Sequence, residues 1–143
     1  MDEGSKTINI LLVDDDDVDT KSITRAIRKA KILNPIYRAV DGIDALALLR
    51  GEGEYEVLPK PYILIVDLKM PRMDGIEFIQ ELREDEKLKS SVVFVLSTSK
   101  HDEEKMAAYN LNVAGYIVKE RAGSDFARLV ELIVNYWRIV ELP

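Results

Sequence analysis

The chain has 143 residues, of which 47% are hydrophobic, and this is enough for one globular domain with a buried core. Its formal net charge of -6 repels phosphate backbones, so direct nucleic-acid binding is disfavoured. The absence of cysteine excludes disulfides, thiolate metal sites and cysteine nucleophiles. The polar N-terminus has no signal region, and no stretch reaches the roughly 20 apolar residues of a membrane span, so we expect a cytoplasmic protein without a membrane segment.

Short apolar runs alternate with longer amphipathic stretches along the chain, beginning with INILLV at 8–13. The stretch that follows, VDTKSITRAIRKAK, places Ile23, Ile27 and Ala30 on one face of a helix. A polar loop with glycine and proline is expected at 51–61. We expect strands at 8–13, 35–40, 62–66, 92–96 and 115–118, and helices at 18–31, 41–50, 75–85, 102–111 and 124–142.

Polar residues near the ends of these segments indicate where the helices begin. Asp17 is the expected N-cap of the first helix, with Asp19 adding negative charge near the positive end of that helix. Asp41 is expected to cap the second helix, and Ser124 the last one. Asp16 is expected to face solvent at the rim, with a partner contact as the alternative.

The strand candidates are apolar throughout, which is typical of strands that helices bury on both faces. Strands that alternate with helices favour a parallel sheet with right-handed crossovers. The sequence therefore predicts an α/β fold with a doubly wound, five-stranded parallel sheet. In such sheets ligands bind beyond the carboxyl ends of the strands.

Chemically active side chains follow four of the expected strands. The first strand ends at Asp14 and Asp15, the third at Asp67, the fourth at Ser97 and the fifth at Lys119. Because parallel strands end at one edge of a sheet, we expect these groups to converge there. Clustered carboxylates need a counter-charge, and a site of few carboxylates that retains waters suits Mg²⁺. A carboxylate at its centre can attack a phosphoryl group whose charge the metal and the lysine neutralise.

Four stretches of the chain resemble the receiver domains of two-component response regulators: ILLVDDD, ILIVDLKMPRMDGIEFIQELR, VVFVLSTS and AGYIVKE. The most specific segment is VDLKMPRMDG, in which a proline and a glycine follow the aspartate at fixed distances. The resemblance implies a flavodoxin-like (βα)5 receiver fold with strand order 2-1-3-4-5. It assigns residues 8–143 to the receiver domain and leaves 1–7 as a disordered N-terminal tail.

The resemblance implies that Asp67 accepts a phosphoryl group from a phosphohistidine on a sensor histidine kinase or a phosphotransfer protein. Asp14, Asp15, Asp67 and the backbone carbonyl of Lys69 then hold Mg²⁺, with Asp15 as a direct ligand and Asp14 acting largely through water. Lys119 pairs with the phosphoryl group. The implied role is that of a signalling phosphoprotein and not of an enzyme, because its phosphotransfer and dephosphorylation are self-catalysed.

The resemblance also marks Ser97 as the switch hydroxyl and Tyr116 as the aromatic switch residue on the neighbouring strand. If Ser97 moves to bond the phosphoryl group, it leaves space into which the Tyr116 ring can turn. Two positions depart from the usual pattern of the family. Glu120 stands where proline usually follows the lysine, so a trans peptide is expected there, and Ser97 replaces the commoner threonine with the hydroxyl retained.

The loop at 51–61 and the ending YWRIVELP resemble single-domain regulators associated with bacterial and cyanobacterial phytochromes. That likeness implies a bacteriophytochrome as the sensor kinase. The last expected helix runs to the end of the chain, so we expect a stand-alone receiver that signals through phosphorylation-dependent protein–protein interaction.

The last helix has more apolar surface than one packed face requires. The stripe expected to cover the sheet consists of Phe126, Val130, Ile133, Trp137 and Val140. A second stripe consists of Leu132, Tyr136 and Ile139. An exposed apolar patch marks an interaction site, so we expect a homodimer through this helix. Loops of the same chain or a docked kinase are the alternative covers.

Other functions compete with the receiver interpretation. An aspartate-nucleophile phosphatase typically has a second aspartate two residues after the nucleophile, where this chain has Lys69. A flavin- or nucleotide-binding protein needs a glycine-rich phosphate loop, and none follows the first strand. A scaffold that is never phosphorylated is the third alternative, and the complete set of site residues argues against it. His101 is the only histidine, which excludes a histidine metal site.

Overall fold

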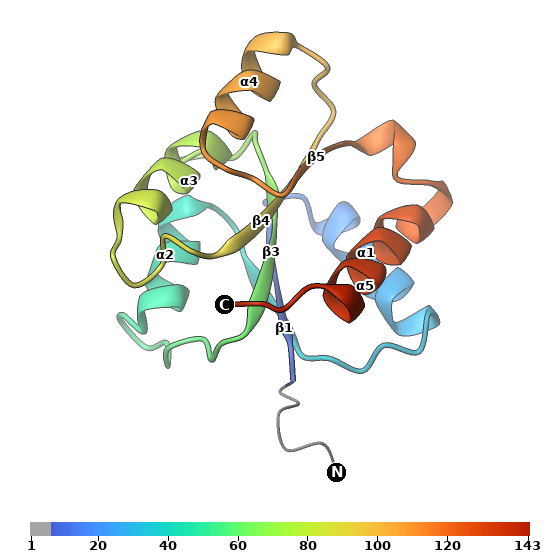
Figure 1. Cartoon of the computed structure of the whole chain (residues 1–143), viewed down its shortest axis with the longest axis horizontal. Helices are drawn as coiled ribbons and strands as arrows, with labels where there is room; N and C mark the ends of the chain where they lie inside the picture. The colour runs from blue at the N-terminus through green and yellow to red at the C-terminus, as the bar shows by residue number, and fades with distance from the viewer. Residues whose placement is uncertain (1–6) are drawn as a thin grey trace.

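A parallel sheet of five strands lies at the centre of the molecule (Figure 1). The computed structural model describes residues 7–143. The strands are β1 (Asn9–Val13), β2 (Ile36–Ala39), β3 (Tyr62–Asp67), β4 (Val92–Ser97) and β5 (Gly115–Val118). Their order in the sheet is β2-β1-β3-β4-β5, which confirms the predicted doubly wound α/β fold and its strand order.

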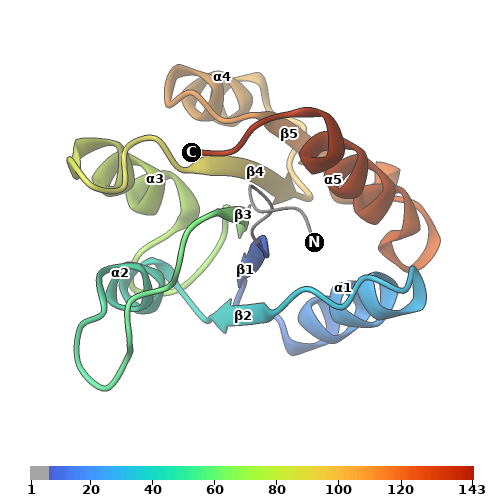
Figure 2. The same ribbon diagram turned by 60° about the horizontal axis from the view of Figure 1, so that its bottom comes forward.

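Helices cover both faces of this sheet. The helical segments are α1 (Asp17–Lys29), α2 (Gly42–Arg50), α3 (Gly75–Glu84), α4 (Asp102–Asn110), the short 3-10 turns η1 (Lys119–Arg121) and η2 (Ser124–Phe126), and α5 (Ala127–Ile139). Figure 2 shows α1 beside α5 on one face, with α2, α3 and α4 on the other. The predicted alternation of strands and helices is therefore confirmed.

Alternate residues of each strand enter two separate core clusters. On β1, Ile10 and Leu12 pack in the cluster that includes Ile27 of α1. Leu11 and Val13 of the same strand pack in the cluster of α2, α3 and α4. Burying one such side chain contributes about 1.5–3 kcal/mol, so both faces of the strand hold it in place. The interiors of β1, β3 and β4 are apolar, and the side chains of Asp14, Asp67 and Ser97 lie at the carboxyl ends of these strands.

The helix starts confirm one predicted cap and correct another. Asp41 caps α2 as predicted, because its Oδ1 accepts the backbone N–H of Asp44 at 2.9 Å. The predicted cap Asp17 is wrong: the N-cap of α1 is Asp16, whose Oδ1 accepts the N–H groups of Val18 and Asp19 at 2.8 and 3.1 Å. The cap shifts back by one residue because Asp16 keeps the extended backbone of the strand exit, whereas Asp17 is already helical.

The last helix begins later than predicted, and Ser124 is not its cap. Ser124 starts η2, in which Asp125 and Phe126 have positive φ values of 53° and 63°. These two residues in the left-handed region interrupt the predicted continuous helix. The α5 helix therefore starts at Ala127, with no side-chain hydrogen bond at its N-cap.

The packed face of α5 also differs from the predicted stripe. Tyr136, predicted on the exposed stripe, instead packs edge-on against Phe94 of β4, with ring centroids 5.1 Å apart. Val140, predicted to cover the sheet, has left the helix and is 39% exposed. The second apolar stripe is reduced to Leu132 and Ile139, which are 45% and 84% exposed.

Trp137 lies on the packed side of α5, as predicted. Together with Ile10, Ile27 and Ile133 it lines a small apolar cavity of about 10 Å³ between β1, α1 and α5. The indole is half-buried there.

Two further expectations concern the N-terminal tail and the absence of a membrane-spanning segment. The disordered tail was expected at 1–7, and residues 1–6 lie outside the described residues, while Thr7 is exposed and precedes β1. Within residues 7–143 we find no helix with the length and apolar character needed to span a bilayer.

Candidate functional site

Three carboxylates meet at the carboxyl edge of the sheet, as predicted. Asp14 and Asp15 follow β1 and Asp67 ends β3, and these two strands are hydrogen-bonded neighbours in parallel register. Each of the three offers one carboxylate oxygen, and these oxygens lie within 4.8 Å of one another. Asp14 and Asp67 are buried, while Asp15 is exposed at the rim.

The charge on Asp14 is held in an unfavourable environment. Burial is the main cause that raises the pKa of its carboxyl to about 7, and the negative charge of Asp67 adds to the shift. The backbone N–H of Asp16, which donates to Asp14 Oδ1 at 2.9 Å, and the ammonium of Lys119 oppose it. A hard divalent cation with oxygen ligands would relieve this repulsion, so the donor set fits Mg²⁺.

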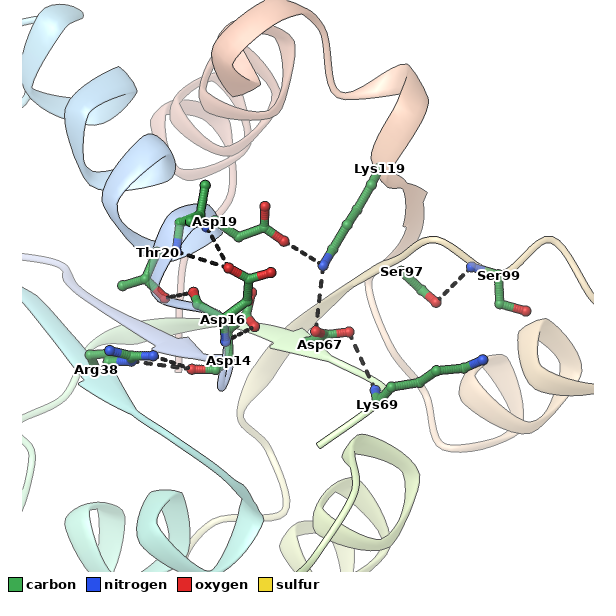
Figure 3. Close-up of polar contacts among 11 residues, drawn as sticks. Asp14, Asp16, Asp19, Thr20, Arg38, Asp67, Lys69, Ser97, Ser99 and Lys119 are labelled. Carbon is green, nitrogen blue, oxygen red and sulfur yellow. Dashed lines mark hydrogen bonds and ion pairs between the residues drawn. The ribbon is translucent and has the colours of Figure 1, made fainter. Parts of the chain in front are cut away.

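Lys119 reaches the cluster from the end of β5. Its Nζ donates to Asp67 Oδ2 at 3.4 Å and to Asp19 Oδ2 at 2.6 Å, as Figure 3 shows. Burial disfavours the ammonium, but the hydrogen bond to Asp19 and the charges of Asp67 and Asp14 outweigh it and raise the pKa of Lys119.

Asp19 is a neighbour of the site whose role the sequence did not predict. It was expected only as a charge near the start of a helix. The signal that could have located it is its place in the first turn of α1, since α1 starts at the same edge of the sheet.

The two predicted switch residues lie near each other and share a neighbour. Ser97 is buried, and its Oγ accepts the backbone N–H of Ser99 at 3.0 Å. The Tyr116 hydroxyl donates to the backbone carbonyl of Ser99 at 3.0 Å, and Tyr116 pairs with Val95 across β4 and β5. In Figure 3 the Ser97 hydroxyl points toward Ser99 and away from Asp67. The backbone N–H and carbonyl of Ser99 therefore link Ser97 to Tyr116.

The loop between β3 and α3 carries Lys69, whose backbone carbonyl was predicted as a metal ligand. The N–H of Lys69 donates to Asp67 Oδ1 at 3.3 Å, and its side chain extends away from Asp67 (Figure 3). Gly75 closes the loop by donating to the carbonyl of Leu68 at 2.9 Å. A Cβ at Gly75 would lie 2.5 Å from the carbonyl oxygen of Asp67, so this position has room only for glycine.

Two arginines fix the segments around the acidic cluster, and the sequence did not single out either. Arg38 of β2 donates from Nε and Nη2 to the backbone carbonyl of Asp14 at 3.2 and 3.1 Å, and from Nη1 to Asp17 at 2.6 Å. Arg72 in the β3–α3 loop donates to the buried Asp41 at 2.6 Å. Both arginines stabilise loops that carry site residues.

The peptide after Lys119 follows the expectation for a chain without proline there. The only cis peptide within residues 7–143 is Lys60–Pro61. Glu120 therefore follows Lys119 in the trans form, and the chain turns directly into η1.

A comparison with known families identifies the arrangement. The family model for the response regulator receiver domain matches residues 10–133. Response regulator Rcp1 of Synechocystis sp. is 34% identical over 143 residues, which cover 99% of this chain and 97% of that protein.

Solved structures agree with this match. The phosphorylated cyanobacterial phytochrome response regulator RcpA is 34% identical, with a TM-score of 0.85 over 94% of this chain and 97% of that one. The Mn²⁺-bound form of response regulator Rcp1 has a TM-score of 0.83 and 34% identity over 94% of this chain and 98% of that one. The fold, the acidic edge of the sheet and these relatives agree: the chain belongs to the response regulator receiver family.

Proposed function

We propose that the protein receives a phosphoryl group on Asp67 from a phosphohistidine and signals through contacts that depend on that modification. The supporting observation is the cluster of Asp14, Asp15 and Asp67, whose carboxylate oxygens lie within 4.8 Å of one another beside the Lys119 ammonium. Family membership supports the same chemistry.

The proposed reaction is a displacement at phosphorus. A carboxylate oxygen of Asp67 forms the new O–P bond while the P–N bond to the donor histidine breaks, and the imidazole leaves with the bond's electron pair. Lys119 stands 3.4 Å from Asp67 Oδ2, where its ammonium can pair with a phosphoryl oxygen. A bound Mg²⁺ would supply positive charge to the transferring oxygens.

The residues proposed to hold that cation are the three carboxylates and the carbonyl of Lys69. Asp15 is exposed and would bind the cation directly, whereas the buried Asp14 would act largely through water. The Mn²⁺-bound form of the relative Rcp1 supports the binding of a divalent cation.

The proposed output is a movement of the β4 and β5 segments. If the Ser97 hydroxyl turns to bond the phosphoryl group, it must release the N–H of Ser99. The surroundings of Tyr116 then change as well, because its hydroxyl donates to the carbonyl of Ser99. This would alter the surface formed by α4, β5 and α5, and with it the binding of a partner protein.

The proposed input is a sensor histidine kinase of the phytochrome type. RcpA is described as a phytochrome response regulator, and it covers 94% of this chain. We place this signalling in the cytoplasm. Rcp1 is matched over 97% of its own length, and we propose that the output of this domain is a contact with a partner protein.

The deciding experiment is intact-protein mass spectrometry after incubation with acetyl phosphate and Mg²⁺. One acid-labile phosphoryl adduct is expected on the wild type and none on Asp67→Asn. Asp74→Asn is the matched control, because Asp74 caps α3 and asparagine can replace it as a cap. An adduct of equal yield on Asp67→Asn, or one that forms equally well with a chelator, contradicts the assignment.

A further inference from the structure

Lys119 has two carboxylate partners in the described structure. The shorter contact, 2.6 Å, joins its Nζ to Asp19 Oδ2 on α1. The longer one, 3.4 Å, joins it to Asp67 Oδ2. The first distance is that of a strong charge-assisted hydrogen bond, and the second lies beyond the usual range. The ammonium therefore sits closer to a residue outside the predicted acceptor site, as Figure 3 shows.

The fold holds both ends of this ion pair in place. Asp19 lies in the first turn of α1, where its own N–H donates to Asp16, and the hydroxyl of Thr20 donates to the Asp16 carbonyl at 2.9 Å. Lys119 begins η1, and its carbonyl accepts the N–H of Ala122 at 3.1 Å. The side chains of Lys119 and Asp19 are only 16% and 22% exposed, so water screens the pair weakly.

We propose that Asp19 is a competing counter-ion that holds the Lys119 ammonium away from a phosphoryl group on Asp67, and so weakens the binding of that group. The inference rests on the proposed function, because it assigns a regulatory partner to the same lysine. Asp19 is a positioning residue in this scheme. It touches Lys119 and does not touch the reacting atoms.

Two electrostatic effects of Asp19 act in the same direction. Its carboxylate attracts the ammonium that the phosphoryl oxygens need, and it adds a negative charge beside a cluster that already has three carboxylates. An incoming phosphoryl group carries negative charge and is disfavoured by both. An ion pair near the surface is worth up to about 1 kcal/mol, which corresponds to about a fivefold change in affinity.

The test is the affinity for beryllium fluoride, used as a phosphoryl mimic and titrated at saturating Mg²⁺ with chemical shifts as the readout. Asp19→Asn should bind it about fivefold more tightly than the wild type, because asparagine keeps an oxygen acceptor but loses the charge. Asp19→Glu, which keeps the charge, should stay within about twofold of the wild type. Asp19→Ser carries the same expectation as Asp19→Asn and replaces it if the asparagine variant does not fold.

The matched control is Asp125→Asn, which removes one negative charge from an exposed residue of η2. Its backbone has a positive φ of 53°, a conformation that asparagine accepts readily. Its affinity for beryllium fluoride should stay within about twofold of the wild type, since a screened surface charge contributes little. An equal gain in Asp125→Asn would attribute the effect to net charge and overturn the role of Asp19.

The outcomes separate the inference from the function on which it rests. A wild type that neither binds beryllium fluoride nor accepts the phosphoryl group of acetyl phosphate refutes the proposed function. A wild type that binds normally, with Asp19→Asn equal to it or weaker, refutes the inference alone. A variant that merely loosens the fold would lower its melting temperature and its affinity together, whereas the proposal requires the affinity to rise.

Discussion

Four successive aspartates after β1 lie in four different environments. Asp14 is buried beside Asp67, and Asp15 is exposed with an oxygen close to both. Asp16 caps α1, and Asp17 pairs with Arg38 at 2.6 Å. The negative charges of the run are thus stabilised by the start of α1, by the Arg38 guanidinium and by solvent. The charge of the buried Asp14 is the one that a bound cation can stabilise.

The burial of Asp14 leads to a prediction about stability. Because its folded pKa is raised from 3.8 to about 7, the folded state binds more protons than the unfolded state between these values, and stability falls as the pH rises through this window. Asp14→Asn should therefore melt a few degrees above the wild type at pH 8 in a chelator. Added Mg²⁺ should raise the melting temperature of the wild type more than that of the variant.

Differential scanning calorimetry with and without Mg²⁺ measures both effects. Asp102→Asn is the control, since Asp102 is 87% exposed and outside the acidic cluster. An Asp14→Asn variant that melts below the wild type in the chelator would contradict the prediction.

Asp41 leads to the opposite pH dependence. Burial alone would raise its pKa, but the hydrogen bonds from Arg72 and from the N–H of Asp44 outweigh burial and lower it below 3.8. A lowered folded pKa stabilises the protein above the unfolded value, and this contribution is lost as the pH falls through the folded pKa. Asp41→Asn should cost about 1 kcal/mol at pH 7, because Arg72 is half exposed, and the difference should shrink below about pH 4.

Urea denaturation of both proteins at pH 7, 5 and 3 checks this prediction. Asparagine keeps the helix cap, so the comparison isolates the charge. A difference that is the same at all three pH values would show that the Arg72 ion pair is not its source.

At the scale of elements, the two ends of α4 differ in their side-chain hydrogen bonds. Near its C-terminus the guanidinium of Arg83 donates to the backbone carbonyls of Leu111 and Asn112 at 2.7 and 3.1 Å. The same group donates to the carbonyls of Lys89 and Ser91, each at 2.7 Å. At the other end His101 occupies the N-cap position and makes no side-chain cap hydrogen bond. The N-terminal end of α4 lies next to the Ser97–Ser99 segment, which the proposed switch must move.

Removing the Arg83 guanidinium should be strongly destabilising. Arg83→Met leaves four backbone carbonyls without their donor, and we expect a loss of about 3 kcal/mol in the free energy of unfolding. Arg83→Lys should not restore stability, because an ammonium lacks the planar fork that reaches several acceptors. Arg50→Met, which breaks a more exposed ion pair with Asp85, is the control and should cost less than about 1 kcal/mol.

Chemical denaturation measures the free energy of unfolding of each variant, and amide exchange shows which part of the chain is destabilised. Faster exchange at the C-terminal end of α4 in Arg83→Met is expected. A loss no larger than that of Arg50→Met would show that water replaces the guanidinium at little cost.

At the scale of the whole molecule, we propose that two copies pair through α5. Leu132 and Ile139 are exposed on this helix, and Tyr136 is not available because it packs against Phe94. The combined variant Leu132→Glu and Ile139→Glu should be monomeric while it still accepts phosphate on Asp67, since the site lies at the carboxyl edge of the sheet. Asn135→Glu, on the side of α5 that faces α1, is the control.

Sedimentation at tens of micromolar protein, with and without phosphorylation, gives the oligomeric state. A wild type that is monomeric in both states would reject the dimer. A double variant that keeps the dimer would place the interface elsewhere.

The sequence predicted the sheet well because strands that are apolar throughout are a strong signal, and because strand ends in a parallel sheet must meet. It could not predict contacts between side chains far apart in the chain. The pair of Lys119 and Asp19, the carbonyls around Arg83 and the inward turn of Tyr136 all depend on tertiary packing. The late start of α5 was missed because two non-glycine residues adopt positive φ, which composition does not reveal.

The place of Trp137 makes the unmodified protein its own optical probe. It is the only tryptophan in the chain, and it lies half-buried where α5 meets β1 and α1. Its emission will follow the detachment or displacement of α5. Because the chain has no cysteine, a single introduced thiol can carry an acceptor dye at any chosen position. Energy transfer from the indole would then measure how far each element moves relative to the last helix.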